Sequence, residues 1–223
     1  MAKVLSETFQ LDIPRWVKDL DSFRRWAHSD GFPHEGRICF MNGEVWADMS
    51  MEELISHNQV KLALDLGLGG YIEENELGLY MPDGMLMTND EAKIGNEPDA
   101  MIALNETLAA KRVRFRAGKK RRAKATELVG SPDIVVEIVS AGSVEKDTDW
   151  LKELYWRSGV PEYWLIDARD EALKFNILKR SATGYVSSRK TQDWVKSTVL
   201  NISVRLLRRE KSHGLHGYKL ELR

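Results

Sequence analysis

The spacing of apolar residues near the start of the chain predicts a helix followed by a hairpin. Apolar side chains recur every three or four residues from 14 to 28, with Trp16 and Trp26 on the side of the helix that we expect to be buried. Apolar residues then lie on either side of Asn42 and Gly43, a pair that tolerates positive φ at both central positions of a tight turn. We therefore expect two antiparallel strands that meet at this pair.

A longer helix is predicted from 51 to 76, with Leu54, Leu62 and Leu66 on its apolar side. Glycines at 67, 69 and 70 weaken its second half, because glycine is a poor helix former. We expect this half either to kink or to pack closely against a neighbouring element.

The second half of the chain alternates predicted strands with one helix. The continuous apolar runs DIVVEIVS, which follows Pro132, and EYWLID, which begins at Glu162, are typical of central strands buried on both faces. A helix is predicted from 147 to 158 and ends at Gly159, whereas the tail beyond Arg208 has no strong pattern. The remaining strands are predicted at 79–88, 99–103, 172–180 and 185–190. This order predicts an α/β fold in which helices cover the faces of a mixed sheet.

Composition narrows the class of protein. With 223 residues, of which 43% are hydrophobic, the chain is long enough for one domain with a sizeable core. The single cysteine, Cys39, excludes a disulfide framework and a cysteine-rich zinc site, and we expect it to pack in the core. No apolar run reaches the roughly 18 residues of a membrane helix, and the first residues lack the apolar stretch of a signal peptide. We expect a soluble, cytoplasmic protein with no membrane partner.

Basic residues are concentrated in one segment, 111–124. Nine of the 33 Lys and Arg residues lie there, whereas all 34 acidic residues lie outside it. A focused basic stretch on an otherwise acidic chain favours a polyphosphate ligand such as nucleic acid, although a solvated loop explains it as well. The candidate nucleic-acid contacts are Lys111, Arg112, Arg114, Arg116, Lys119, Lys120, Arg121, Arg122 and Lys124.

Two acidic residues adjoin predicted strands in a way that suggests chemistry. Glu137 lies inside IVVEIV, where an isolated buried carboxylate is costly unless it is paired, protonated or bound to a metal. Asp99 begins another apolar strand, and if the two strands are adjacent both acids can bind one hard cation, with carbonyls and waters completing its shell. Asp133 lies on the same face as Glu137 but about 13 Å away along the strand, too far to share that ion. The structural alternatives are a buried ion pair for Glu137 and a turn role for Asp99.

Four blocks of sequence resemble one family. EPD at 97–99, PDIVVEIVS at 132–140, KDT at 146–148 and LYWRSGVPEYWLIDAR at 154–169 are similar to the Uma-type endonuclease family of the PD-(D/E)XK, restriction-endonuclease-like superfamily. The resemblance covers about 35–190. It implies a four-stranded mixed sheet flanked by helices, and hydrolysis of phosphodiester bonds with Mg²⁺, or with Mn²⁺ in its place.

The resemblance also implies roles for single residues. Asp99 matches the strand aspartate of the superfamily, and Glu137 matches the acid of the following strand. These two carboxylates would hold the metal ion together with the backbone carbonyl of Ile138.

The catalytic lysine of the superfamily has no direct match. It normally follows the acid by two residues, where this chain has Val139. The Uma-type family commonly offers a lysine from the next helix instead, at the position of Leu151 here. Lys152 is adjacent, but helical spacing turns it away from the apolar side of that helix. Lys146 precedes the helix and can reach back toward Glu137, so we expect it to orient water or stabilise charge, with Lys152 as the second choice. An ordinary solvated lysine is the structural alternative for either.

Two further residues are candidates for the border of the site. His57 lies near the start of the long helix, one turn after Glu53, and proteins similar to the family often have a histidine there. It would meet a phosphate or a water, although a surface pair with Glu53 explains it equally well. Glu44 follows the hairpin turn and could supply another acid, but a solvent-facing turn residue is the simpler interpretation.

These observations support three hypotheses about function. The first is a metal-dependent endonuclease acting on nucleic acid, with DNA favoured, in which the basic segment holds the backbone without reading sequence. The second is a catalytically impaired nucleic-acid-binding module on the same fold, and the third is a protein-interaction scaffold. We divide the chain into an N-terminal helical extension (1–34), a nuclease core (35–190) and a C-terminal extension (191–223). Analogy with enzymes that cut two strands favours a homodimer.

Overall fold

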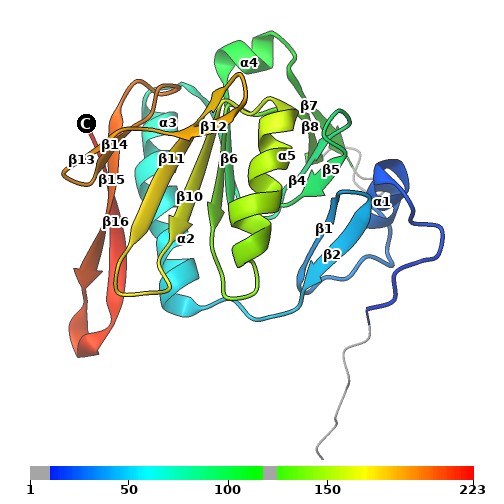
Figure 1. Cartoon of the computed structure of the whole chain (residues 1–223), viewed down its shortest axis with the longest axis horizontal. Helices are drawn as coiled ribbons and strands as arrows, with labels where there is room; N and C mark the ends of the chain where they lie inside the picture. The colour runs from blue at the N-terminus through cyan, green and yellow to red at the C-terminus, as the bar shows by residue number, and fades with distance from the viewer. Residues whose placement is uncertain (1–10, 118–124) are drawn as a thin grey trace, which may run out of the picture.

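The computed structural model describes residues 11–117 and 125–223. A six-stranded sheet in the order β12-β11-β10-β9-β6-β3 lies at its centre (Figure 1). Its strands are β3 (Gly78–Pro82), β6 (Ala100–Leu104), β9 (Ile134–Ile138), β10 (Glu162–Asp167), β11 (Lys174–Ser181) and β12 (Gly184–Ser187). Strands β9 and β10 are parallel and the other neighbours are antiparallel, so the sheet is mixed, as the sequence predicts. It has six strands, however, and not the four that the family resemblance implies.

A second six-stranded sheet and helix α5 (Leu151–Ser158) cover one face of the central sheet. The second sheet has the order β2-β1-β5-β4-β8-β7. Its strands are β1 (Arg37–Met41), β2 (Glu44–Asp48), β4 (Leu86–Asn89), β5 (Ile94–Asn96), β7 (Val113–Ala117) and β8 (Ala125–Gly130). Val135 and Tyr163 of the central sheet pack in one cluster with Leu154 of α5 and Cys39 of β1. The expected core position of Cys39 is therefore confirmed.

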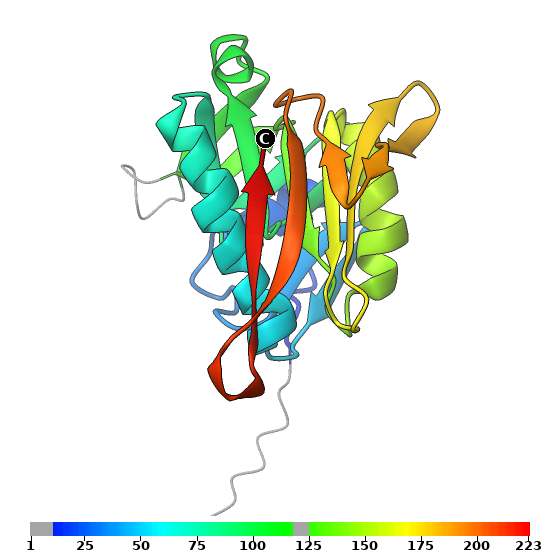
Figure 2. The same cartoon turned by 90° about the vertical axis from the view of Figure 1, so that its left-hand side faces the viewer.

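A long helix and a C-terminal sheet cover the other face (Figure 2). The helix runs without a break through η1 (Leu54–Asn58), α2 (Gln59–Leu64), η2 (Asp65–Gly69) and α3 (Gly70–Glu74), of which η1 and η2 are π-helical. The C-terminal sheet has the order β13 (Lys190–Thr191), β14 (Trp194–Lys196), β15 (Ser203–Glu210) and β16 (His216–Leu222), with a short 3-10 helix, η4 (Ser212–Gly214), between the last two strands. Val136 and Trp164 of the central sheet pack in one cluster with Leu64 of α2 and with Val204 and Leu220 of the C-terminal sheet.

Three short helical segments complete the described residues. Helix α1 (Leu20–Ala27) packs against β1, α4 (Asn105–Ala109) follows β6, and η3 (Lys146–Trp150) is a π-helical segment that continues directly into α5. None of the helices in 11–117 and 125–223 has the length and apolarity that crossing a membrane requires.

The predicted hairpin is confirmed, but the predicted start of the first helix is wrong. Asn42 and Gly43 have φ values of 51° and 87° and join β1 to β2. Helix α1 begins only at Leu20, because the side chain of Asp19 accepts a hydrogen bond from the backbone N–H of Ser22 and caps the helix there. Trp16, which the sequence predicts on the buried side, therefore lies outside the helix and is 48% exposed.

The long helix is confirmed, but its predicted apolar side is wrong. Leu62 and Leu66 are exposed, whereas the buried stripe includes Val60, Leu64 and Leu68, four residues apart. Wide π-helical turns with i→i+5 hydrogen bonds lie at both ends of α2 and shift the face of the helix that meets the sheet. Close packing is confirmed for Gly67 and Gly69, where an added Cβ would lie 2.8 Å from Cβ of Leu220 and 3.0 Å from Cδ1 of Tyr80, but not for Gly70, where nothing among the described residues lies within 4 Å.

Two stretches of the chain form strands that the sequence pattern does not separate. The predicted strand 79–88 is two strands, β3 and β4, because the turn that contains Gly84 (φ 94°) interrupts it. The tail beyond Arg208, where no pattern is evident, forms the end of β15 and all of β16. The division of the chain into 1–34, 35–190 and 191–223 stays a prediction. Residues of 191–223, such as Val204, pack in the same hydrophobic core as residues of 35–190.

Candidate active site

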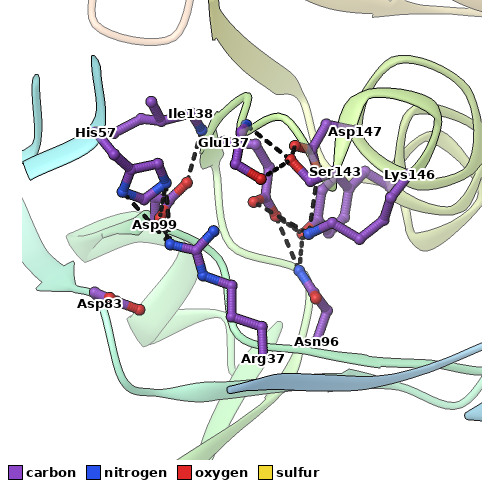
Figure 3. A network of polar contacts seen from close by, with 12 residues as sticks. Arg37, His57, Asp83, Asn96, Asp99, Glu137, Ile138, Ser143, Lys146 and Asp147 are labelled. Atoms are coloured by element: carbon purple, nitrogen blue, oxygen red, sulfur yellow. Dashed lines mark hydrogen bonds and ion pairs between the residues drawn. The ribbon is translucent and has the colours of Figure 1, made fainter. Parts of the chain in front are cut away.

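The start of β6 and the end of β9 meet at one end of the central sheet. The two strands are antiparallel with Ala100 opposite Val136, so Asp99 lies beside the end of β9. There Oδ2 of Asp99 accepts a hydrogen bond of 2.7 Å from the backbone N–H of Ile138. Asp99 and Glu137 are 6% and 2% exposed, and both side chains enter one buried polar network (Figure 3).

The carboxylate of Glu137 has neutral donors on one oxygen and a cation near the other. Oε1 accepts hydrogen bonds from Nδ2 of Asn96 at 2.9 Å and from the hydroxyl of Tyr155 at 2.5 Å, while Oε2 lies 4.0 Å from Nζ of Lys146. Burial raises the pKa of Glu137 to about 8, because the charge of Lys146 only partly offsets it and nearby carboxylates such as Asp147 add to the rise. The charged form of Glu137 is therefore disfavoured unless a further cation lies beside it.

Lys146 is buried at the first turn after the loop that follows β9. Its Nζ lies 3.0 Å from Oδ1 of Asp147 and 5.1 Å from the centroid of the Trp46 ring, and Ser143 donates a hydrogen bond to Oδ2 of Asp147. Burial alone would lower the pKa of Lys146, but the charges of Glu137 and Asp147 outweigh it and raise that pKa above its ordinary value. The ammonium therefore stays protonated beside Glu137.

Asp99 is surrounded by basic side chains. Its Oδ1 lies 3.4 Å from Nε2 of His57, 3.4 Å from Nζ of Lys61 and 3.9 Å from Nη2 of Arg37. Burial would raise the pKa of Asp99, but the hydrogen bond and charge of His57 and the charges of the other two groups hold it well below its usual range. Asp99 and Glu137 thus have opposite pKa shifts although they lie in the same network.

A further acid fixes these basic side chains in place. Glu52 lies 2.5 Å from Nη2 of Arg37, 2.8 Å from Nζ of Lys61 and 3.4 Å from Nδ1 of His57. Asp83 also pairs with Lys61. Groups from β1 and from the long helix are thereby held around Asp99.

Comparison with known proteins identifies the family to which the chain belongs. The model of the Uma2 family, described as "Putative restriction endonuclease", matches residues 20–204. The chain belongs to the Uma2 family. Among solved structures it is similar to one titled as "a putative nuclease belonging to DUF820 from Anabaena variabilis", with a TM-score of 0.59 and 13% identity over 82% of this chain and 90% of that chain. The expected family is thus confirmed, and the fold is restriction-endonuclease-like. No curated protein matches the chain.

The fit of the acids of the site to a metal ion matters, since restriction-endonuclease-like proteins are typically metal-dependent. Among the described residues, no group of three or more His, Cys, Asp or Glu is arranged to hold one. The chain offers three possible ligands: the carboxylates of Asp99 and Glu137 and the backbone carbonyl of Ile138. This carbonyl points to the same edge of β9 as the N–H of Ile138, which donates to Asp99. Because all of these donors are oxygen atoms, they fit a hard cation such as Mg²⁺ or Mn²⁺, with water in its remaining positions.

The structure separates the two candidate lysines. Lys146 comes within 4.0 Å of Glu137, while Val139, at the usual lysine position, is buried and Leu151 is packed in the core. Lys152 is half-buried on α5, and in the part of the chain that the structure describes no ion pair joins it to either acid of the site. The geometry therefore favours Lys146.

Of the two candidates for the border of the site, His57 contacts the network of described residues and Glu44 does not. His57 is 2% exposed and contacts Asp99 and Glu52, so the surface pair with Glu53 is wrong, and Glu53 instead accepts a hydrogen bond from Ser56. Glu44 is exposed at the start of β2, where a solvent-facing turn residue is expected.

Several members of the network are not predicted from the sequence. They are Arg37, Glu52, Lys61, Asn96, Ser143 and Asp147. Arg37 and Asn96 lie on β1 and β5 of the second sheet, which the sequence pattern does not align with the central sheet. Lys61 lies one helical turn after His57, so an i,i+4 search from that histidine would have found it.

The basic segment lies at the other end of β9. Arg112 pairs with Asp133 at 2.8 Å, and Asp133 directly precedes β9, about four residues or 13 Å along the strand from Glu137. Exposed basic residues of this segment line a cavity of about 520 Å³: Lys111, Arg112, Arg114 and Arg116. Five of the predicted contacts fall outside the described residues: Lys119, Lys120, Arg121, Arg122 and Lys124. A nucleic acid that touches both regions must therefore extend along the molecule.

Proposed function

We propose that this Uma2-family protein is a metal-dependent endonuclease that hydrolyses phosphodiester bonds of nucleic acid, with DNA as its substrate. The observation that carries the proposal is the pair of buried acids, Asp99 and Glu137, linked through Ile138 and faced by the ammonium of Lys146. Buried carboxylates are costly to fold, and acids with opposite pKa shifts in one cluster are typical of functional sites. The family description supports the reaction class.

Asp99, Glu137 and the carbonyl of Ile138 would hold the metal ion. When bound, such an ion acidifies a water and neutralises charge on the scissile phosphate. The residues around these ligands fix their orientation: Asn96 and Tyr155 hold Oε1 of Glu137, and the N–H of Ile138 holds Oδ2 of Asp99. The site is therefore organised before any ligand arrives.

Lys146 acts as a cation and not as a base in this scheme. Its raised pKa keeps the ammonium protonated at neutral pH, so it cannot accept the proton of the attacking water. It can donate to that water or to a phosphate oxygen, and it stabilises the negative charge that grows as water adds to phosphorus and the opposite P–O bond breaks.

Positive charge near the site supports a polyanionic substrate. The side chains of Arg37 and Lys61 are 26% and 14% exposed at the border of the acid pair, where they could meet a phosphate. The basic segment supports nucleic acid over a small phosphate ester, because only an extended ligand could reach it. The choice of DNA, a homodimer and a cytoplasmic location are predictions that rest on the sequence alone.

One observation favours a second function, a nucleic-acid-binding module that does not cleave. Oδ1 of Asp99 has two cationic neighbours, Lys61 and Arg37, and the imidazole of His57 within 3.9 Å. Positive groups on that oxygen repel a divalent cation and partly take its place. Binding of nucleic acid without metal-dependent cleavage would then be the remaining activity.

Cleavage assays separate the two functions. Supercoiled plasmid, linear duplex, single-stranded DNA and RNA are incubated with Mg²⁺, with Mn²⁺ or with EDTA. The proteins compared are the wild type, Glu137→Gln, and a control variant, Lys179→Gln, which changes an exposed residue of β11.

If the protein is a nuclease, it should cleave DNA in the presence of Mg²⁺ or Mn²⁺. EDTA and the Glu137→Gln substitution should abolish this cleavage, whereas Lys179→Gln should leave it unchanged. Cleavage that persists in Glu137→Gln would contradict the assigned site. Salt-sensitive binding with no cleavage in any metal would establish the binding module instead.

A further inference from the structure

The outward face of the C-terminal sheet carries a dense group of basic residues. In this sheet Val204 is opposite Leu222 and Leu206 is opposite Leu220, and these apolar residues point toward the core. The residues between them in register point outward. The basic ones, which we call the C-terminal basic face, are Lys196, Arg205, Arg209, Lys219 and Arg223.

A single acidic residue lies among the outward positions of β14, β15 and β16. Glu221 is 2.7 Å from Nη2 of Arg205, 3.2 Å from Nη2 of Arg209 and 3.3 Å from Nζ of Lys219. One carboxylate therefore holds three cations in a row and neutralises only one charge. The side chains of Arg209 and Lys219 are still 53% and 59% exposed, so they remain available to a ligand.

An aromatic ring orders the other end of this face. The guanidinium carbons of Arg205 and Arg223 lie 4.6 and 4.1 Å from the centroid of the Trp194 ring. Such cation–π contacts fix the direction of a long side chain that would otherwise lose rotamer freedom on binding. The face is therefore a preorganised array of cations and not a set of separate solvated lysines.

The position of the face relates it to the candidate active site. The hairpin of β15 and β16 runs beside the long helix, and Lys211, near its tip, donates a hydrogen bond of 2.9 Å to Oε1 of Gln59 (Figure 2). Gln59 is two residues from His57, which contacts Asp99. The C-terminal basic face thus starts at the end of the helix where the acid pair lies, and it continues away from that pair along the outer surface.

We propose that the C-terminal basic face binds the phosphodiester backbone of nucleic acid outside the active site. The inference rests on the proposed function for its ligand, and on charge complementarity for its surface. The whole chain has a net charge of −1, so this positive surface is local and not a consequence of overall composition. Cations spaced along two antiparallel strands suit the regular phosphates of a strand, and they contact the backbone without reading bases.

The test uses the full chain with EDTA present, so that binding is measured without cleavage. Fluorescence anisotropy follows a labelled 30-base-pair duplex over a range of salt concentrations. The face variant combines Arg209→Gln, Lys219→Gln and Arg223→Gln. The matched control removes three exposed basic residues from α5 and β11, by Arg157→Gln, Lys174→Gln and Lys179→Gln. Circular dichroism melting checks that both variants fold.

We expect the face variant to bind the duplex about tenfold more weakly than the control at low salt. The logarithm of the binding constant decreases linearly with the logarithm of the salt concentration, and the magnitude of this slope should decrease by roughly 0.9 for each lost phosphate contact. Equal affinity and slope for the two variants would overturn the proposal. Equally tight binding to polyglutamate, or to phosphatidylserine vesicles, would overturn it too, because the face would then be a general anion surface.

The outcome is independent of the proposed chemistry. Loss of duplex affinity in the face variant stands even if the wild type cleaves nothing. Normal cleavage by a protein whose face variant binds like the control leaves the proposed endonuclease intact and removes only this inference.

Discussion

The ammonium of Lys146 lies 4.0 Å from Oε2 of Glu137, although the lysine comes nine residues later and from a different element. In the superfamily pattern the lysine lies on the strand itself, at the position of Val139 here. That position is buried, and its N–H is bonded to the carbonyl of Ile166 in the sheet. Lys146 instead lies in the π-helical segment η3, and its ammonium, which packs over the Trp46 ring, reaches Glu137 from there.

Replacing Lys146 should therefore remove catalysis. We expect Lys146→Gln to reduce cleavage by roughly 10²–10³-fold, the usual cost of one preorganised electrostatic contact. Lys146→Arg keeps the charge and should restore part of the rate. Rates on a labelled duplex with Mg²⁺ measure both.

A separate variant tests Lys152, the second candidate for the catalytic lysine. Lys152→Gln removes the charge that lies on α5, away from the acid pair. A large loss in Lys152→Gln together with a normal rate in Lys146→Gln would contradict the assignment of Lys146.

Glu137 should be required for activity but not for stability. Burial raises its pKa to about 8, so the free protein gains little from this carboxylate. In Glu137→Gln the amide can still contact Asn96 and Tyr155, and Lys146 keeps Asp147 at 3.0 Å. We expect the free energy of unfolding to stay within about 1 kcal/mol of the wild type, while cleavage falls by about 10³-fold or more.

Thermal melting and cleavage rates, measured on the same preparations of wild type and Glu137→Gln, test this prediction. A variant that loses activity and also several kcal/mol of stability would instead identify Glu137 as part of a structural ion pair. That was the alternative left open by the sequence.

The acid pair could be predicted from the sequence, because each acid interrupts or borders an apolar run. Glu137 in IVVEIV and Asp99 before AMIAL are conspicuous in one dimension, and the antiparallel pairing of β6 and β9 needed only the assumption that the strands are neighbours. The hairpin at Asn42 was predictable for a similar local reason, since the turn requires positive φ.

The surroundings of the pair could not be predicted in the same way. Arg37 and Asn96 reach the site from the second sheet, and Lys61 reaches it from a helix whose buried face is shifted by π turns. Each is an ordinary polar residue in its local pattern. Only the packing of three layers brings them together, and single-sequence periodicity carries no information on that packing.

Arg112 should be a structural residue, unlike its neighbours in the basic segment. Asp133 is buried and accepts hydrogen bonds from the N–H of Leu104, from Thr107 and from Arg112. Removal of one partner of a buried carboxylate typically costs about 1–3 kcal/mol. We expect Arg112→Gln to lower the free energy of unfolding by that amount and to leave the salt dependence of DNA binding nearly unchanged.

The matched comparison is Arg114→Gln, which removes an exposed charge two residues away. It should leave stability within about 0.5 kcal/mol of the wild type. It should also reduce the slope of log K against log salt by about 0.9. Urea unfolding and anisotropy titrations measure the two effects, and the same profile for both variants would contradict this division of roles.

Acid should destabilise the protein partly through Glu127, a buried residue of β8. Oε1 of Glu127 accepts hydrogen bonds of 2.6 Å from Nε of Arg24 and from Oγ1 of Thr88, and Oε2 lies 2.9 Å from Nε2 of His28. Burial acts to raise its pKa, but the hydrogen bonds and the charge of Arg24 outweigh it and lower the pKa from 4.5 to about 2. Because the folded-state pKa lies below the unfolded one, this group stabilises the fold above pH 4.5, and the contribution disappears as the pH falls toward 2.

The shift corresponds to a contribution on the order of 3 kcal/mol at neutral pH. Glu127→Gln should lose a stability of this size at pH 7, and its free energy of unfolding should depend less steeply on pH between 4.5 and 2 than that of the wild type. Denaturant unfolding at several pH values measures both curves. Parallel curves would show that the protonation of Glu127 does not contribute to acid unfolding. Curves that also coincide would show that the Arg24–Glu127 pair gives no net stabilisation over its neutral replacement.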